Sequence, residues 1–281
     1  NNFRDTLEAQ EKPLVPSKRL EKYHDPLTLY ALGLIRAAIN EMPSRAQPLL
    51  LTILGETAMK FSIFRRSPAP RIRKTRHTYS LDEVKRYFLE KLLQAINDLK
   101  KLKSNSIVEL IHSDSTSWLP QKVECVLTSP PFANNVDYIR HTMLQLLWAG
   151  IVKNSRDLGK LRSMQIPACE AAARSWKAEL REKWLEMYLN NIRGKRAKNY
   201  RKFLAQYFYY MNKHLELLAS RLLYIAWYTI GDSYLGGAYI PTHKFIARLA
   251  REHGLKFELK PIKERMRPGR TLYLLRLFNP R

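Results

Sequence analysis

The sequence predicts an α/β protein with a partial, mainly parallel sheet, a helical N-terminal segment and a helical insertion. Apolar residues recur at helical spacing through most of the N-terminal third. After residue 104, continuous apolar runs alternate with helical stretches, a pattern typical of a parallel sheet with helices on both faces. A helical stretch at about 138–220 separates two of these runs and is much longer than a crossover connection requires.

The N-terminal segment, residues 1–104, is expected to contain three helices. An Asp-Pro pair opens the first, at 26–41, before apolar residues spaced three and four apart. The second lies at 48–64 and ends before a proline-containing loop. The third begins at SLDE, residues 80–83, which matches a capping box, and extends to about residue 103.

Five strands are expected in a core made of residues 105–150 and 203–281. They are IVELI (107–111), VECVLT (123–128), RLLYIAWYTI (221–230), LKFELKPI (255–262) and TLYLLRLF (271–278). The last two are joined by so short a link that they should pair antiparallel. Further helices are expected after Asp137 and at 242–253, and residues 151–202 form the insertion.

Composition excludes several classes of protein. No run approaches the roughly 18 apolar residues of a membrane-spanning helix, and no signal peptide opens the sequence. Cys125 and Cys169 are too few for a disulfide framework or a cysteine-based metal site. We therefore expect a cytoplasmic protein without a bound metal. The first residue is Asn1 rather than methionine, which suggests that further residues precede it.

The charge balance favours a polyanionic partner. The 49 Lys and Arg residues exceed the 25 Asp and Glu residues, for a net charge of +24. Each phosphate that a protein neutralises releases condensed counterions, so nucleic acid is the expected partner. The charge is concentrated in residues 64–76 and 153–202, although either segment alone could be a solvated helix face. The expected contacts are Arg71, Arg73, Arg193, Lys195, Arg196, Lys198 and Arg201.

Two prolines and an aromatic residue directly follow a predicted strand, in VECVLTSPPF. Proline has no N–H, so Pro130 and Pro131 end the hydrogen-bond ladder and stiffen the turn. The carboxyl end of a strand in an open parallel sheet borders the ligand site. There, carbonyl groups and the Ser129 hydroxyl would accept hydrogen bonds from the exocyclic amine of a base, on which Phe132 stacks. Alternatively, the prolines only end the strand and Phe132 is a core residue.

TSPPF, preceded by IHSDSTSWLP and followed by ANNVDYIRHTMLQLLW, resembles the motif of DNA amino-methyltransferases that use S-adenosylmethionine. The similarity is greatest to those with a Ser-Pro-Pro-aromatic motif, which methylate N4 of cytosine. It covers about residues 105–281, because YTIGDSYLGGAYIPTHKFIARLAREHGL also resembles a later strand, loop and helix of these enzymes. Residues 25–64 look like a linker found in some of them. The resemblance implies a Rossmann-like class I methyltransferase sheet, double-stranded DNA as substrate and a restriction-modification system.

The resemblance also implies the residues that bind the target base. Ser129 and the Pro130 carbonyl would hold the amine, and Pro131 and Phe132 would complete the catalytic motif. Phe132 stands where tyrosine is commoner in the family, a change that preserves stacking.

Other residues are implied around the cofactor and the base pocket. Asp114 would lie near the adenine of S-adenosylmethionine, or would only cap a turn. Asp232 and Ser233 would border the cofactor pocket. Asp137 and Tyr138 would line the base pocket, or would only begin a helix.

The sequence departs from the family at the cofactor loop. These enzymes carry a Phe-x-Gly-x-Gly turn, whereas none of the ten glycines here forms Gly-x-Gly. The nearest candidate, GDSYLGG at 231–237, lacks that spacing. The expected strands are also fewer than such a sheet usually has. We therefore expect a second chain, or an upstream segment, to supply the missing strands and the Gly-rich loop.

The main functional interpretation is therefore a site-specific DNA cytosine-N4 methyltransferase that needs this additional polypeptide. One alternative is a DNA-binding specificity subunit that has a methyltransferase-like fold and no catalytic activity. Another is an RNA base methyltransferase, because a Ser-Pro-Pro-aromatic turn does not distinguish the sugar. Binding of S-adenosylmethionine separates the main interpretation from the first alternative, and a substrate assay separates it from the second.

Overall fold

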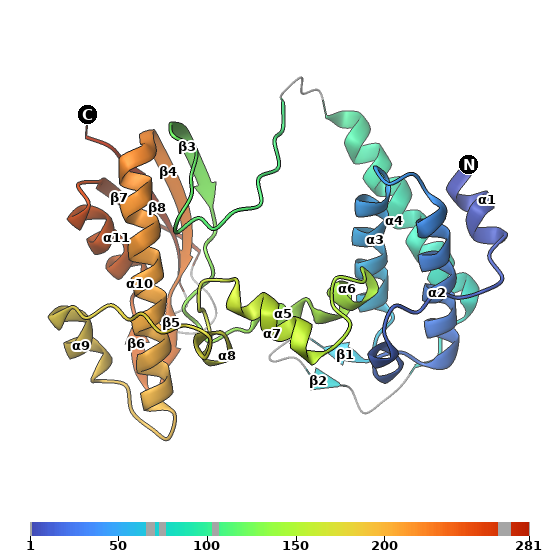
Figure 1. Cartoon of the computed structure of the whole chain (residues 1–281), viewed down its shortest axis with the longest axis horizontal. Coiled ribbons are helices and arrows are strands. Elements are labelled where there is room, and N and C mark those ends of the chain that lie inside the picture. The colour runs from blue at the N-terminus through green and yellow to red at the C-terminus, as the bar shows by residue number, and fades with distance from the viewer. Residues whose placement is uncertain (1, 66–70, 73–76, 103–106, 264–270, 281) are drawn as a thin grey trace. The chain divides into compact units, whose positions relative to one another are not determined.

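The computed structural model describes residues 2–65, 71–72, 77–102, 107–263 and 271–280. They form two compact units, a helical unit of residues 1–108 and 138–160 and a sheet unit of residues 109–137 and 161–281 (Figure 1). In this division residues 138–160 belong with the N-terminal helices, and residues 161–202 belong with the sheet. No helix in the described ranges combines the length and apolar character needed to span a membrane.

The helical unit is built around three helices that contact one another, α2, α3 and α4. Its elements are α1 (Asn2–Glu8), a 3-10 helix (Lys18–Lys22), α2 (Pro26–Glu41), α3 (Gln47–Lys60), β1 (Phe64–Arg65), β2 (Arg71–Ile72), α4 (Leu81–Lys101), α5 (Tyr138–His141), α6 (Met143–Trp148) and the start of α7 (Ser155–Ser163). The three predicted N-terminal helices are confirmed. Asp25 caps α2 by accepting hydrogen bonds from two backbone N–H groups, and Ser80 and Glu83 form the predicted capping box of α4.

A buried histidine joins α2, α3 and α6 within this unit. Nε1 of Trp148 donates to Nε2 of His24 over 3.1 Å, and Nδ1 of His24 lies 3.3 Å from the carbonyl oxygen of Phe61. An indole N–H only donates and a carbonyl only accepts, so the ring is neutral with its proton on Nδ1. Burial lowers the pKa of His24 from 6.5 to about 4.

We expect this histidine to make the helical unit less stable in acid. Between about pH 6.5 and pH 4 the unfolded chain binds a proton at His24 and the folded chain does not. The stabilisation is therefore complete above pH 6.5, and up to about 3 kcal/mol of it is lost by pH 4. Urea unfolding at a series of pH values checks this against His24→Gln, which cannot titrate and should lack this part of the pH dependence. If the free energy of unfolding changed with pH in the same way in the wild type and in His24→Gln, the prediction would be contradicted.

The sheet unit holds a four-stranded sheet with the order β3–β4–β8–β7. The strands are β3 (Val123–Thr128), β4 (Leu222–Gly231), β7 (Lys256–Lys263) and β8 (Leu272–Phe278). The antiparallel pairing of the last two strands is confirmed. The described strands agree with the prediction of a mainly parallel sheet with an antiparallel last strand: β3, β4 and β7 run in the same direction, and β8 is antiparallel to both β4 and β7. The short link between β7 and β8 makes these two strands antiparallel. Because β8 lies between β7 and β4 and is antiparallel to both, β7 and β4 run in the same direction.

The strand predicted at residues 107–111, in contrast, is wrong. These residues form no helix or strand, and Ile107, Val108 and Leu110 are 99%, 89% and 96% exposed. An extended segment becomes a strand only when a neighbour accepts its backbone hydrogen bonds. In the part of the chain that the structure describes, no strand pairs with these residues.

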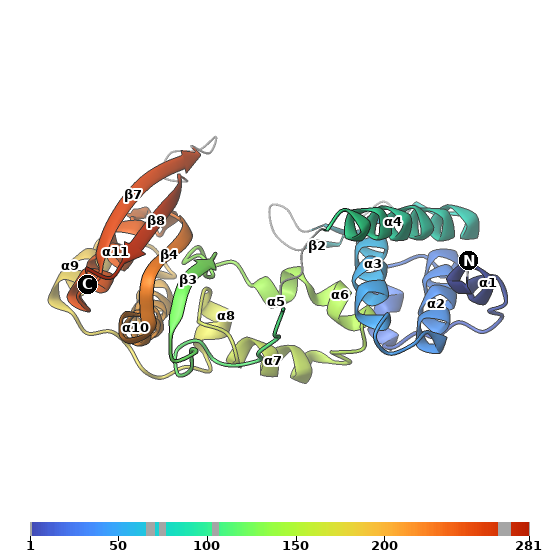
Figure 2. The ribbon, with the colours of Figure 1, turned by 90° about the horizontal axis from the view of Figure 1, so that it is seen from above.

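The main helices of the sheet unit cover one face of the sheet. The remaining elements are α8 (Glu170–Ala173), α9 (Lys183–Leu189), α10 (Ala197–Arg221), β5 (Ser233–Leu235), β6 (Ala238–Ile240) and α11 (Thr242–Glu252). Figure 2 shows α10 and α11 on the same side of the sheet, where Ala226, Tyr228 and Ile230 of β4 are buried. Coverage of both faces was expected. Instead, the opposite face carries Leu127, which is 82% exposed, and the half-buried Trp227.

Candidate functional site

The Ser-Pro-Pro-Phe turn directly follows β3, as predicted. Because β3 and β4 are parallel, their carboxyl ends lie at the same edge of the sheet. Ser129 is exposed there, whereas Pro130, Pro131 and Phe132 are half-buried. A Cβ atom at Gly231 would lie only 2.8 Å from Cδ2 of Phe132. The aromatic ring therefore packs directly on the end of β4, where a side chain would displace it.

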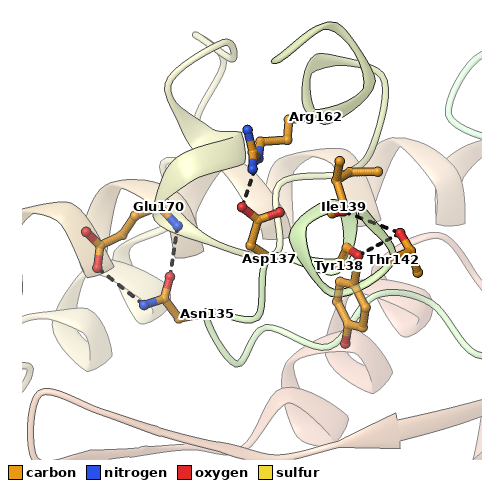
Figure 3. Close-up of polar contacts among 7 residues, drawn as sticks. All are labelled: Asn135, Asp137, Tyr138, Ile139, Thr142, Arg162 and Glu170. Carbon is orange, nitrogen blue, oxygen red and sulfur yellow. Dashed lines mark hydrogen bonds and ion pairs between the residues drawn. The ribbon is translucent and has the colours of Figure 1, made fainter. Parts of the chain in front are cut away.

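The loop after Phe132 is held by Asn135. This residue has φ +59°, in the left-handed region, which asparagine tolerates better than most residues other than glycine. Its Oδ1 accepts a hydrogen bond from the Glu170 backbone N–H over 2.9 Å, and its Nδ2 donates to Oε1 of Glu170 over 3.4 Å (Figure 3). These two bonds fix both the side chain and the unusual backbone conformation.

An ion pair restrains the end of the same loop. Nε of Arg162 lies 2.8 Å from Oδ2 of Asp137, and both side chains are mostly buried (Figure 3). α5 begins at the next residue, Tyr138, whose carbonyl accepts a hydrogen bond from the Thr142 hydroxyl. The contacts of Asp137 and Tyr138 thus agree with the helix-start alternative, and their role in a base pocket stays a prediction. Arg162, Asn135 and Glu170 were not predicted from the sequence.

Asp114 caps a tight turn. Its Oδ1 accepts hydrogen bonds from the N–H and the hydroxyl of Thr116, both over 2.9 Å. His214 of α10 holds the same turn, because its Nδ1 lies 2.9 Å from the Ser115 carbonyl oxygen and its Nε2 lies 2.6 Å from the Tyr228 hydroxyl. Burial lowers the pKa of His214, so the ring donates to the carbonyl and accepts from the tyrosine. The Asp114 turn is thereby tied to β4, and its contact with a cofactor stays a prediction.

Asp232, at the end of β4, lies in a buried polar network. Its Oδ1 is 2.6 Å from Nδ1 of His243, and its Oδ2 accepts a hydrogen bond from the Tyr239 hydroxyl. Burial and the bond to Asp232 raise the pKa of Tyr239. Both carboxylate oxygens of Asp232 are therefore used within the protein. The buried Ser233 hydroxyl, in contrast, has no hydrogen-bond partner among the described residues, and its contact with a cofactor stays a prediction.

The segment GDSYLGG forms the β5–β6 hairpin. Gly236 and Gly237 occupy its turn with φ +56° and φ +77°, a conformation that requires glycine or asparagine. A Cβ atom at Gly236 would lie 2.5 Å from the carbonyl oxygen of Arg193. Both glycines are thus explained by the turn and by its contact with the basic segment, without a cofactor.

The predicted DNA-binding residues fall into two groups. Lys195 and Lys198 are exposed at the start of α10, and among the described residues neither forms an ion pair. The other three in this region have partners within the protein: Arg193 and Arg201 donate to the Asn190 carbonyl, and Arg196 pairs with Glu170. Arg71 is exposed in β2, whereas Arg73 lies outside the described residues.

A pocket of about 660 Å³ lies beside the first half of α10. Four basic residues and two acidic residues line it, together with apolar residues; the charged ones are Arg181, Lys198, Arg201, Lys202, Glu179 and Glu186. The cations outnumber the carboxylates, so the net charge of this surface is positive and favours phosphate groups.

Comparisons with known proteins give one partial similarity. The chain is 28% identical over 120 residues, 40% of its length, to the Type II methyltransferase M.BsoBI of Geobacillus stearothermophilus. The chain spans only 23% of the length of that relative. No protein-family model and no solved structure matches the chain.

Proposed function

We propose that this chain is the target-base half of a DNA methyltransferase that transfers a methyl group from S-adenosylmethionine to N4 of cytosine. The observation that carries the proposal is the Ser-Pro-Pro-Phe turn at the carboxyl end of β3, beside Gly231. The partial similarity to a Type II methyltransferase supports methylation of DNA as the broader function. The excess of basic residues supports DNA as the substrate.

The turn has the groups needed to activate an exocyclic amine. The lone pair of this amine is delocalised into the cytosine ring, so the nitrogen is a poor nucleophile. Acceptors at Ser129 Oγ and the Pro130 carbonyl would bind the two N–H groups and favour a pyramidal nitrogen. Phe132 would stack on the extruded base and fix its plane. As the new nitrogen–methyl bond formed, the bond between that methyl group and the sulfonium sulfur would break to release S-adenosylhomocysteine, and the cationic nitrogen would then lose a proton to solvent.

The described residues fit the target base better than the cofactor. S-adenosylmethionine would supply an electrophilic methyl group, but the chain has no Gly-x-Gly turn and both oxygens of Asp232 are occupied. Ser233 and the Asp114 turn stay as predicted contacts, and they would form only a small part of a cofactor site. We therefore infer that another polypeptide segment forms most of the cofactor site.

The sheet supports this inference. In the described residues, β3 pairs with β4 along one edge and with no strand along the other. Leu127 is 82% exposed on this strand. Folded proteins avoid an unpaired edge with exposed apolar side chains, because it recruits other chains. A second polypeptide segment that pairs with β3 would cover the unpaired edge.

A non-catalytic DNA-binding subunit is the second candidate. Two observations favour it: His243 and Tyr239 already bond to the Asp232 carboxylate, and the sequence contains no Gly-x-Gly turn.

Transfer of labelled methyl groups from S-adenosylmethionine to DNA or RNA separates the candidates, provided that the protein is assayed together with its co-purifying chains. We expect label in DNA alone. Label in RNA alone, or none in either, would overturn the proposed function.

Binding of DNA should depend on salt through Lys195 and Lys198. Each phosphate that the protein no longer neutralises should reduce the slope of log affinity against log salt by about one. We therefore expect the Lys195→Gln, Lys198→Gln double variant to lower the slope by about two, with similar decreases in affinity on different DNA sequences. Lys213→Gln is the control, because this lysine of α10 pairs with Glu216. An unchanged slope in the double variant would mean that this surface is only solvated.

A further inference from the structure

One carboxylate connects the loop after Phe132 to the basic start of α10. Oε1 of Glu170 accepts from Asn135, and its Oε2 accepts from Nη2 of Arg196 over 3.0 Å and from Nδ2 of Asn199 over 3.3 Å. The Glu170 side chain is 12% exposed, whereas that of Arg196 is 61% exposed. An almost buried acidic group is therefore restrained from two sides, by the loop and by a surface cation.

The loop needs this restraint. Asn135 holds a left-handed backbone conformation that costs free energy unless its surroundings stabilise it. It lies three residues after Phe132, and the intervening Asn134 donates its backbone N–H to the Phe132 carbonyl over 2.8 Å. A change at Asn135 would therefore be transmitted over a short, hydrogen-bonded segment to the aromatic ring.

We propose that Glu170 is a positioning residue for the Ser129–Phe132 turn, and that Arg196 holds it in place. This inference rests on the proposed function of that turn. Arg196 then has two roles, because it lies on the surface expected to face DNA and it also orients the carboxylate that fixes Asn135. Lys198, two residues further along, has only the first role. The DNA-facing surface and the target-base turn are thereby coupled through one side chain.

The Glu170→Ala variant should separate catalysis from DNA binding. We expect kcat to fall roughly tenfold, because a misplaced acceptor no longer activates the amine fully. DNA affinity should stay the same or increase, because a negative charge beside Arg196 is removed.

Glu170→Gln should keep most of kcat, since its side-chain oxygen still accepts from Asn135. Glu182→Ala, at an exposed position, removes the same charge and should leave kcat unchanged. Equal kcat in wild type and Glu170→Ala would overturn the proposal.

A second variant tests the partner of Glu170. Asn135→Gly adopts a positive φ without steric cost but removes the side chain that bonds to Glu170. We expect its kcat to fall at least as far as that of Glu170→Ala, because Asn135→Gly removes both bonds to Glu170. The double variant should fall no further than Asn135→Gly, because Glu170 acts through Asn135. Arg196→Ala should lower kcat and DNA affinity, whereas Lys198→Ala should lower affinity alone. Decreases that multiply in the double variant would show that Glu170 acts elsewhere.

Hydrogen exchange tests positioning without methyl transfer. In the DNA-free protein, the backbone amides of residues 133–136 should exchange faster in Glu170→Ala than in wild type or Glu170→Gln. Unchanged exchange in Glu170→Ala would overturn the positioning role, whatever the activity. Absence of methyl transfer in the wild type, with exchange altered as expected, would overturn the proposed function and leave the positioning of the loop supported.

Discussion

Replacing Ser129 by alanine is expected to abolish methyl transfer and to leave DNA binding almost unchanged. The hydroxyl would accept a hydrogen bond from the target amine, and without it the lone pair stays delocalised into the base. Contacts to phosphates dominate affinity, and Ser129 lies at the end of β3 rather than in the basic segment. Transfer of labelled methyl groups and a parallel DNA-binding titration measure the two effects.

Phe132 offers a matched pair of variants for the same experiment. Phe132→Ala should also abolish transfer, because it removes the stacking surface and the packing against Gly231. Phe132→Tyr should remain active, since an aromatic face is kept. Ser220→Ala is the control for Ser129→Ala, because Ser220 lies near the exposed end of α10 and donates to the Leu217 carbonyl. Full methylation by Ser129→Ala would refute the assignment of the turn.

The isolated chain is expected to bind S-adenosylmethionine weakly or not at all, and to self-associate. It lacks a Gly-x-Gly turn, and among the described strands β3 has one unpaired edge and carries the exposed Leu127. Calorimetry measures cofactor binding, and sedimentation measures association. Leu127→Lys should reduce self-association, because a charge on an edge strand opposes pairing with another chain. A stable monomer that binds the cofactor at low-micromolar concentration would show that the cofactor loop lies within this chain.

Elements with strong local signals could be predicted from the sequence. The starts of α2 and α4 follow from capping residues, whose hydrogen bonds are the ones expected. The bounds of β3 are also as predicted, because Pro130 and Pro131 cannot continue a ladder. These features depend on residues a few positions apart, so no knowledge of the tertiary structure is needed.

Features that depend on distant partners could not be predicted. Residues 107–111 have the composition of a strand, but strand formation requires a neighbour that the described residues do not provide. Glu170 is separated by 35 positions from Asn135, and no periodic pattern relates the two. The one local signal was the pair Asn134–Asn135 after an aromatic residue, which is typical of a turn and of left-handed backbone.

The measurement that most directly tests the proposed function is mass analysis of nucleosides from genomic DNA. The DNA is taken from cells that contain the protein with its natural partners, carrying either wild-type Ser129 or the Ser129→Ala substitution. The proposed function predicts N4-methylcytosine in the wild type and its loss in the variant. Methyladenine as the sole Ser129-dependent product, or no Ser129-dependent methylated base at all, would contradict it.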